Sequence, residues 1–453
     1  MGQAQGDVQS ERKRSKNFNE VSLGYPKKLA AEESRRCPQC SDAVCAKSCP
    51  LGIDIPGFIR RLREGRVAEA YGIIRENNIL PAICGRVCSA PCEVTCILND
   101  EDAPIGIRML ERYASDHGRV RTARKETLRR KGKRIAVVGS GPAGLSVAAE
   151  LAVKGYQVRI FESFDQPGGV LRYGIPEFRI PTKVLEYEVD EIRALGVEIE
   201  TNCCVGWTKS IEEIKKEGFV AVVLALGAGI PKFMDLPGTN LGGVYYGEEF
   251  LMRLNQRRPN ALSAEDVSFP LGPKVVVIGS GNTALDCARA ARRLNKDVTL
   301  VFRRTIDEMR VRDEERRFGE QEGVAIEPLV KPLEILPSQD NFVDGIKCMR
   351  MDYADVKSDG TWTLIPVPDS EFVLEADTVV IAIGHHPNSV IKKINKRLKV
   401  NEDGSVKVDE QTGQTSIKGV YAAGNVVTNA GPVVEAIASG RDIARKIHKV
   451  LMG

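Results

Sequence analysis

Two stretches of the chain share one pattern of apolar and polar positions. Arg134–Val138 and Lys274–Ile278 are short and almost continuously apolar after their first residue, a pattern typical of a buried parallel strand. Each is followed by a glycine-rich turn, a helical stretch and a second apolar run, at Gln157–Phe161 and Asp297–Phe302. This order of strand, turn, helix and strand predicts two Rossmann-type units in an α/β chain.

The segment before the first unit, from residue 20 to residue 128, differs in kind. It contains helical stretches at Ile55–Leu62 and Val67–Asn77 and eight of the chain's 12 cysteines. These cysteines form two runs of four. The first run has the spacing C-x2-C-x4-C-x3-C-P, and the second has three residues between neighbouring cysteines. Eight thiolates are enough for two four-iron clusters, and proline directly after the last cysteine is typical of ferredoxins.

Zinc and disulfides are the alternative uses of so many cysteines. Zinc sites take four ligands in paired spacings, unlike the gaps of four and three residues seen here. Met1–Asn19 is polar and no apolar run reaches membrane-spanning length, so we expect a cytoplasmic protein without membrane insertion, whose thiols stay reduced. The chain has 453 residues, 42% of them apolar and 28% charged, and a net charge of +4, which indicates a soluble protein of several domains and gives no case for nucleic-acid binding.

The first glycine-rich turn has the fingerprint of a dinucleotide site. It runs Gly139-Ser-Gly-Pro-Ala-Gly144, with a strand before it and a helix after it, and Glu162 ends the second strand. Glycines let the backbone approach a pyrophosphate at the helix N-terminus, and an acid at this distance accepts hydrogen bonds from the adenosine ribose.

The second turn differs in two ways that bear on specificity. It runs Gly279-Ser-Gly-Asn-Thr-Ala284, so alanine takes the place of the third glycine, and Arg303-Arg304 takes the place of the ribose-binding acid. An arginine here suits the 2′-phosphate of NADP, which an acid would repel. The alternative is a solvated arginine pair, and we favour the NADPH site.

Further motifs resemble one family over nearly the whole chain. They are Gly168–Pro181, Val298–Arg304, Ala382–Asn388 and Tyr421–Asn425. The chain resembles the small subunit of NADPH-dependent glutamate synthase and, equally, the large subunit of NADH-dependent ferredoxin:NADP oxidoreductase. Its N-terminal block is similar to that of dihydropyrimidine dehydrogenase. Leu80–Cys88 points to the ferredoxin:NADP oxidoreductase branch and Ala90–Glu93 to the glutamate synthase branch, so the branch stays open.

The resemblance implies an α/β fold with an N-terminal helical iron–sulfur domain (1–128), followed by nested Rossmann-like domains of the glutathione-reductase type. FAD would bind to residues 129–240 and 376–453, and NAD(P)H to residues 241–375. Relatives carry an aspartate at position 425; Asn425 can still accept a hydrogen bond but brings no charge. The expected FAD residues are Gly139, Gly141, Pro142, Ala143, Gly144, Glu162, Gly169, Arg172, Gly424, Asn425 and Val433. The expected NADPH residues are Gly279, Gly281, Asn282, Thr283, Ala284, Arg303 and Arg304.

The resemblance also divides the cysteines between two 4Fe-4S clusters. Cluster one would be held by Cys37, Cys40, Cys45 and Cys96. Cluster two would be held by Cys49, Cys88, Cys92 and Glu111, with Cys84 as the alternative fourth ligand that spacing alone would choose. A carboxylate ligand would alter the potential of that cluster.

The implied function is electron transfer from NADPH through FAD and both clusters to a partner catalytic subunit or a ferredoxin-type acceptor, in a hetero-oligomer. No catalytic residue is expected beyond those that hold cofactors. The alternatives are a ferredoxin:NADP oxidoreductase subunit, bifurcating or not, and a non-catalytic wiring subunit. A flavin disulfide reductase would need a cysteine pair beside the flavin, and Gly168–Gly174 contains none.

Overall fold

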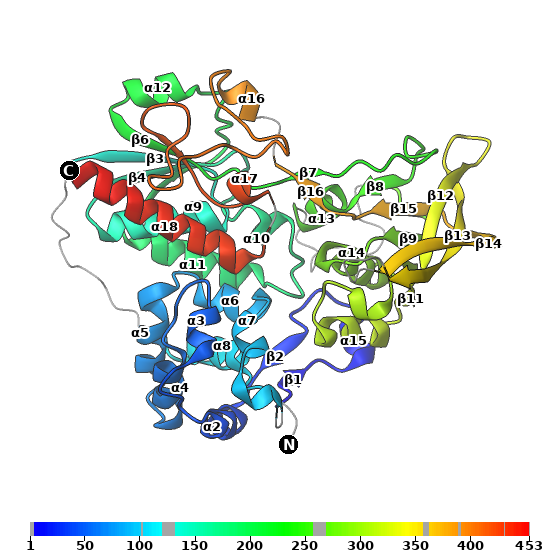
Figure 1. Cartoon of the computed structure of the whole chain (residues 1–453), viewed down its shortest axis with the longest axis horizontal. Helices are drawn as coiled ribbons and strands as arrows, with labels where there is room; N and C mark the ends of the chain where they lie inside the picture. Colours follow the sequence, from blue (N-terminus) through cyan, green and yellow to red (C-terminus); the bar gives the residue numbers. More distant parts are fainter. Residues whose placement is uncertain are drawn as a thin grey trace.

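The two repeated sequence units form two separate five-stranded parallel sheets (Figure 1). The structure is a computed structural model that describes residues 4–100, 103–119, 132–256, 269–356, 362–387, 391–429 and 431–452. The expected domain boundary between residues 128 and 129 lies outside these residues. No helix in the described ranges is long and apolar enough to cross a membrane.

The N-terminal part is a bundle of short helices with a small β-ribbon at its side. Helix α8 (Ile107–His117) lies at its centre and is buried from Ile107 to Ser115. Charged residues inside this helix therefore need partners within the protein. The other elements are β1 (Asp7–Val8), α1 (Glu11–Arg14), β2 (Ser22–Gly24), α2 (Lys27–Arg36), α3 (Val44–Ser48), α4 (Ile55–Arg63), α5 (Val67–Asn77), α6 (Pro81–Val87), α7 (Pro91–Val94) and the 3-10 turn η1 (Ile97–Asp100).

The first sheet has the strand order β17-β6-β3-β4-β5, with every pair parallel. Helices α9 and α18 pack on it and are tied together by a hydrogen bond from Ser146 Oγ to the carbonyl of Ile437 at 2.7 Å. Its elements are β3 (Arg134–Val138), α9 (Pro142–Val153), β4 (Gln157–Phe161), α10 (Val170–Tyr173), α11 (Thr182–Ala194), β5 (Glu198–Glu200), α12 (Ile211–Lys216), β6 (Phe219–Leu224), α16 (Ile391–Ile394), β17 (Val420–Ala422), α17 (Asn425–Thr428) and α18 (Val433–Met452).

The second sheet has the order β11-β10-β9-β15-β8 and is also parallel. The antiparallel sheet β12-β13-β14 extends from its side. The elements of this lobe are β8 (Val244–Tyr246), α13 (Gly247–Gln256), β9 (Lys274–Ile278), α14 (Asn282–Arg293), β10 (Asp297–Val301), the 3-10 turn η3 (Ile306–Glu308), α15 (Asp313–Gln321), β11 (Ala325–Glu327), β12 (Val330–Pro337), β13 (Val343–Val356), β14 (Trp362–Leu374) and β15 (Thr378–Ile381).

One expected boundary is wrong. The segment from residue 376 was assigned to the FAD-binding sheet, but β15 pairs with β9 and β8 in the second sheet, with Val379 opposite Val276 and Val244. A four-residue apolar strand can complete either parallel sheet, so its sequence does not tell which one it joins. The chain returns to the first lobe through β16 (His385–His386), which pairs with the outgoing strand β7 (Ile230–Pro231).

The helical bundle is not a separate module, because it shares its core with the first sheet. One apolar cluster includes Phe58 and Ile83 of the bundle together with Ala149 and Val434 of the first lobe. A second cluster joins Phe18 to the core of the other lobe. Continuous burial of this kind fixes the bundle rigidly against both lobes.

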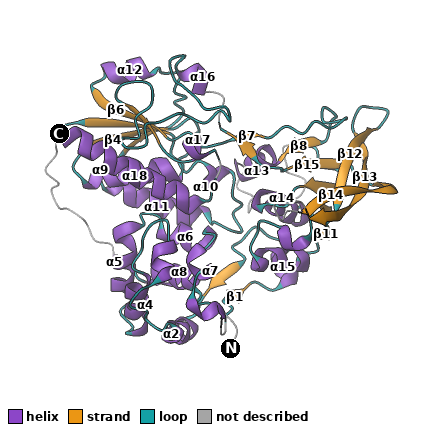
Figure 2. Cartoon of the chain, viewed as in Figure 1, coloured by secondary structure: helices purple, strands orange, loops and turns teal. Residues whose placement is uncertain are grey.

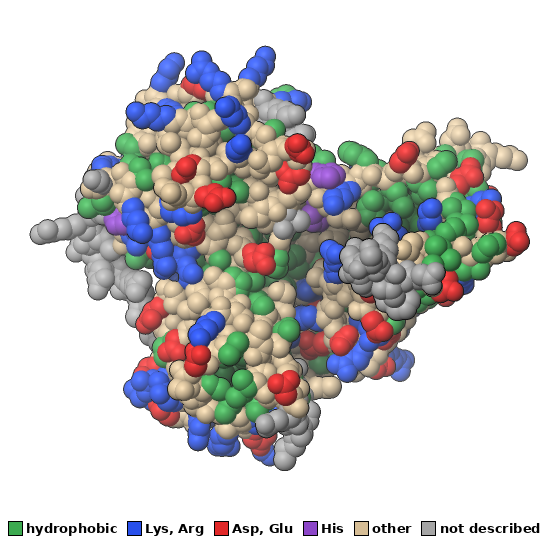
Figure 3. Space-filling model, viewed as in Figure 1, with side chains coloured by type: hydrophobic (Ala, Val, Ile, Leu, Met, Phe, Trp, Pro, Cys, Tyr) green, Lys and Arg blue, Asp and Glu red, His purple; other side chains and the backbone are tan. Residues whose placement is uncertain are grey.

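The surface shows no dominant charge. On the face in Figure 3, acidic and basic side chains are interspersed, in line with the small net charge. Hydrophobic side chains gather over the β12-β13-β14 sheet on the same face. Phe342, directly before β13, is 49% exposed, and Ile365 and Val373 of β14 are 41% and 56% exposed.

Candidate functional site

Four cysteines from separate segments come together at the edge of the helical bundle. This first cysteine group consists of Cys37, Cys40, Cys45 and Cys96, all partly exposed. Burial, together with smaller contributions from the neighbouring Cys37, Cys96 and Cys40, raises the pKa of Cys45 to about 11. Helix α3, which carries Cys45, packs against α7 just before Cys96, and Thr95 Oγ1 donates to Ser48 Oγ at 2.9 Å. The two cysteine runs are thus interleaved in space.

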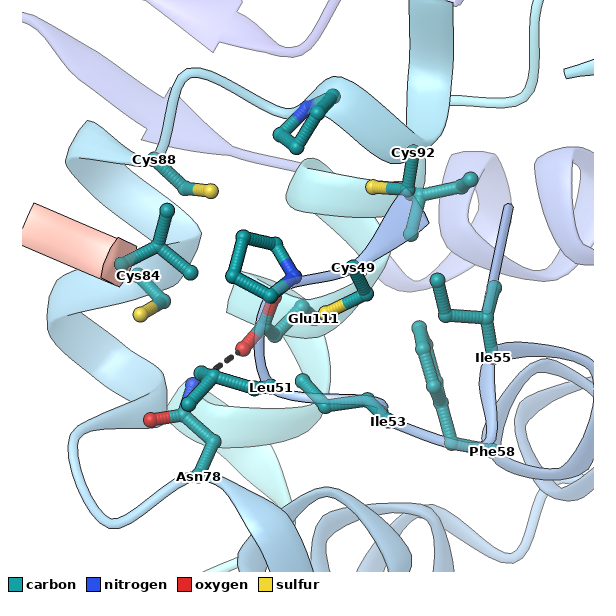
Figure 4. Close-up of a pocket in the computed structure, with 14 residues that line it drawn as sticks. Cys49, Leu51, Ile53, Ile55, Phe58, Asn78, Cys84, Cys88, Cys92 and Glu111 are labelled. Atoms are coloured by element: carbon teal, nitrogen blue, oxygen red, sulfur yellow. Dashed lines mark hydrogen bonds between the residues drawn. The ribbon is translucent and has the colours of Figure 1, made fainter. Parts of the chain in front are cut away.

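A second cysteine group lies deeper, around a closed cavity between the bundle and the first lobe (Figure 4). Figure 4 shows four thiols and one carboxylate around the same space, carried by the end of α3, by α6 and α7, and by α8. These residues are Cys49, Cys84, Cys88, Cys92 and Glu111. Ile55, Phe58 and Val434 are among the apolar residues that complete the walls.

Burial favours the protonated form of the thiols in the second group. Burial raises the pKa of every one of them, that of Cys88 to about 12, and the charge of Glu111 adds to the effect. A metal centre must therefore displace protons as it binds, as thiolate ligation generally requires. Apolar walls around such thiols suit a cluster that exchanges electrons and not water.

Glu111 is the one carboxylate in this cavity, and it is 7% exposed. Asn78 Nδ2 donates to its Oε1 at 2.8 Å. Burial raises the pKa of Glu111 to about 8, while the hydrogen bond from Asn78 and the charge of Arg108 oppose that rise. Cys84 lines the same cavity and is 1% exposed. Both candidates for the fourth ligand thus reach the site.

Thiolate donors of the kind in both cysteine groups suit an iron–sulfur cluster. Among the residues with a described position, no three His, Cys, Asp or Glu side chains form a group that could hold one metal ion. A four-iron cluster fills the space between its ligands with iron and sulfide, so the test of fit is which thiols face a common space. Four thiols, those of Cys49, Cys84, Cys88 and Cys92, line the inner cavity.

The expected flavin residues converge at the N-terminus of α9. Gly168 N donates to Ser140 Oγ at 2.9 Å, and a Cβ on Gly169 would lie 2.8 Å from Gly141 Cα, so the Gly168–Gly169 loop crosses the glycine turn. Pro142, Ala143 and Gly144 form the first turn of α9. Arg172 lies on α10 beside this loop, where its Nε donates to the carbonyl of Pro167 at 2.8 Å.

Glu162 is 3% exposed and its carboxylate is already engaged by the protein. Its Oε2 accepts from Ser140 N at 2.9 Å and its Oε1 from Phe164 N at 2.9 Å. A carboxylate oxygen accepts more than one hydrogen bond, so a ribose hydroxyl can still be accommodated. The structure places Glu162 beside the glycine turn, as the fingerprint requires.

The C-terminal part of the chain completes this site. Gly424 has a φ of 75°, and a Cβ there would lie 2.6 Å from Ala143 Cβ, so only glycine fits this close approach. Asn425 follows, and its Nδ2 donates to the carbonyl of Gly431 at 3.1 Å. Helix α18 then starts at Val433. Its next residue, Val434, is the one that lines the second cysteine cavity.

The second glycine turn, with Gly279 and Gly281, opens helix α14, whose first three residues are Asn282, Thr283 and Ala284. Arg303 is exposed at the end of β10, and Arg304 is ion-paired with Glu308 at 3.4 Å. Both expected arginines therefore lie just after strand β10, beside the turn, and one of them is partly neutralised.

Arg310 is a residue that sequence reasoning missed. Its backbone N–H donates to the carbonyl of Ser280 at 3.1 Å, and Asn282 Nδ2 donates to its carbonyl at 3.4 Å. The side chain is exposed, so the backbone of a further arginine lies at the glycine turn with its guanidinium open to solvent. Its position in a loop after η3 carries no motif that could have revealed it.

Comparison with known proteins matches both halves of this architecture. Residues 14–123 match the family model described as dihydropyrimidine dehydrogenase domain II, 4Fe-4S cluster. Residues 133–440 match the model of the pyridine nucleotide-disulphide oxidoreductases. The chain belongs to this oxidoreductase family. The predicted fold class, two Rossmann-like units behind a helical iron–sulfur domain, is confirmed.

Individual relatives resemble this oxidoreductase over most of its length. It is 33% identical to the glutamate synthase [NADPH] small chain of Azospirillum brasilense, covering 96% of this chain and 92% of the relative. The resemblance to that small chain is thereby confirmed. It is 36% identical to the NADP(+)-dependent formate dehydrogenase subunit beta of Moorella thermoacetica, over 90% of this chain but only 60% of that subunit.

A solved structure supports the fold of the two nucleotide units. FprA from Mycobacterium tuberculosis in complex with NADPH superposes with a TM-score of 0.58. The match covers 71% of this chain and 84% of FprA at 20% identity, which speaks for the fold alone.

Proposed function

We propose that this oxidoreductase takes electrons from NADPH at an FAD and passes them, through two 4Fe-4S clusters, to a partner protein. One observation carries the proposal: α18 starts at the flavin site with Val433, and its Val434 lines the second cysteine cavity. The proposed flavin site and this cavity therefore lie next to each other, at the start of α18. When bound, the flavin accepts two electrons as hydride and can release them singly, and each cluster accepts one.

Each cofactor would be held by its own set of residues. Gly139–Gly144, Glu162, Gly169, Arg172, Gly424, Asn425 and Val433 would hold FAD, and Gly279–Ala284 with Arg303 and Arg304 would hold NADPH. Cys37, Cys40, Cys45 and Cys96 would hold the cluster nearer the surface. Cys49, Cys88, Cys92 and Glu111 would hold the inner one. Electrons would move from the buried inner site to the partly exposed outer one and leave there.

We propose Glu111 over Cys84 as the fourth inner ligand. Glu111 comes from α8 at the centre of the bundle, and its free side faces the thiols while Asn78 holds its Oε1. Cys84 is more deeply buried and lies on α6, one turn before Cys88, so two ligands would have to come from a single helix turn.

The proposal includes a partner protein that accepts the electrons. The relatives are named as a small chain or as beta subunits, which supports a hetero-oligomer with a partner catalytic subunit or a ferredoxin-type acceptor. Isolation of the complex from its native host, followed by identification of the co-purifying protein, tests this. A chain that purifies alone and reduces no protein acceptor would contradict it.

An anaerobic titration of the reconstituted chain with NADPH tests the entry of electrons. The visible flavin absorbance should bleach, and the broad cluster absorbance should fall after it. NADH at the same concentrations should act more weakly, because the Arg303–Arg304 pair has no 2′-phosphate to bind. Absence of bleaching with either nucleotide would instead support a non-catalytic wiring subunit.

A further inference from the structure

A segment of three residues connects the nucleotide turn to the inner cysteine group. At one end the Arg310 backbone N–H donates to the carbonyl of Ser280 in the glycine turn at 3.1 Å. At the other end Arg312 Nη1 reaches the carbonyl of Cys88 at 3.4 Å, and its Nη2 reaches the carbonyl of Arg86 at 3.5 Å. We call Arg310–Arg312 the linking segment.

The carbonyls that Arg312 reaches form the C-terminal end of α6. Arg108 of α8 donates to the same end, with its Nη1 at 3.1 Å from the carbonyl of Gly85. A helix C-terminus carries partial negative charge, so two guanidinium groups are favourable there. Both also place positive charge beside Cys88, a thiol of the inner cavity.

The nucleotide lobe holds both guanidinium groups in place. Glu315 of α15 accepts from Arg312 Nη2 at 2.8 Å, and Glu314 accepts from Arg108 Nη2 at 2.9 Å. Arg312 directly precedes α15 as its N-cap residue. Any displacement of the linking segment therefore moves a charge at the inner cavity without first deforming the helical bundle.

We infer that Arg312 is a positioning residue that couples nucleotide binding at Gly279–Ala284 to the reduction potential of the inner cluster. The inference rests on the proposed function. A nearby cation stabilises the reduced, more negative cluster and so raises its potential. The contacts of Arg312 with the two carbonyls are long for hydrogen bonds, so a nucleotide phosphate that draws Arg310 onto the glycine turn can tighten them.

The test measures the reduced fraction of the inner cluster by EPR in the full, reconstituted chain at fixed potentials. The probe is adenosine 2′,5′-bisphosphate, which carries the 2′-phosphate and the adenosine-side 5′-phosphate of NADP but no nicotinamide and is redox-inert. In the wild type the probe should increase the ratio of reduced to oxidised cluster severalfold. Binding of the probe is measured calorimetrically on the same samples, so failure of the nucleotide site is told apart from failure of the coupling.

Three variants test the role of Arg312. Arg312→Met should lower the ratio without the probe about tenfold, equivalent to about 59 mV for one electron, and abolish the response to the probe. Arg312→Lys should keep most of the resting ratio, because it keeps the charge, but lose the response. Arg316→Met is the matched control, since Arg316 lies one turn further along α15 and pairs with Glu320 at 2.8 Å, and it should behave as the wild type.

Iron content is determined for every sample. If Arg312→Met fails to retain iron, Arg312→Lys decides the question through its loss of response. A wild type that binds the probe without any change in the inner cluster would overturn the inference. So would an Arg312→Met variant that retains its iron and responds like the wild type.

Discussion

The two cysteine groups use the same side chains in opposite surroundings. All four thiols of the first group are partly exposed, whereas Cys84, Cys88 and Cys92 of the second group are buried and share their cavity with Val434 of the flavin lobe. Burial and charge near a cluster set its potential. The contrast supports the proposed order, in which the inner site would receive electrons from the flavin and the outer site would pass them on.

Loss of a thiol from either group should disrupt electron transfer through the two sites most strongly. Cys92→Ser should remove about half of the iron and abolish transfer to any acceptor, because thiolate ligands hold the cluster, while flavin bleaching by NADPH persists. Cys96→Ser should also halve the iron, but the remaining inner cluster should still be reduced by NADPH. Iron analysis and EPR distinguish the two.

Cys348→Ser is the control for both, since Cys348 is buried in the antiparallel sheet away from either group. Reduction of the remaining cluster by NADPH in Cys92→Ser but not in Cys96→Ser would reverse the proposed order of the two sites.

Single variants of Glu111 and Cys84 identify the fourth ligand of the inner site. Glu111→Ala should change the EPR signal and potential of the inner cluster only, since the outer group lies elsewhere in the bundle. Cys84→Ala should leave both signals unchanged. The opposite result, an altered inner signal in Cys84→Ala and none in Glu111→Ala, would give the ligand role to Cys84.

Entry of electrons should depend on the arginines beside the second turn. Replacing Arg303 and Arg304 together by alanine should raise the KM for NADPH by about 10- to 100-fold, because hydrogen bonds to charged groups contribute about 1.5–3 kcal/mol. The KM for NADH should change little. Steady-state reduction of an artificial acceptor by each nucleotide measures this, and equal losses for both nucleotides would argue against 2′-phosphate recognition.

The smallest expected effect concerns the joint between the flavin helix and the inner site. Arg441 of α18 donates to the carbonyls of Leu51 and Asn77 at 2.6 and 3.0 Å. Arg441→Met should lower the free energy of unfolding by about 1–3 kcal/mol, because buried carbonyls lose their partner. It should also slow reduction of the inner cluster after NADPH is added.

Denaturant titration and stopped-flow absorbance measure the two effects. The matched control is Arg445→Met, one turn further along α18, where a more exposed arginine contacts Glu150 at 3.2 Å. If both variants are equally stable and equally fast, Arg441 does not join the two sites.

The two Rossmann units and the cysteine set could be predicted from the amino-acid sequence alone. Apolar runs followed by Gly139–Gly144 and Gly279–Ala284 can satisfy backbone and side chains in few other ways than strand, turn and helix. These elements occur in the structure as β3 with α9 and β9 with α14. Local patterns of this kind are readable because each residue's neighbours in sequence are also its neighbours in space.

The way in which distant segments combine becomes visible in the three-dimensional structure and not before. The strand Thr378–Ile381 joined the second sheet and not the first, because strand pairing is set by contacts that its own sequence does not encode. Arg310 reached the glycine turn, and Arg312 reached Cys88 across a sequence separation of 224 residues. Val434 brought the flavin helix to the inner thiols. These contacts depend on how buried surfaces pack together, and no periodicity or motif in the sequence predicts them.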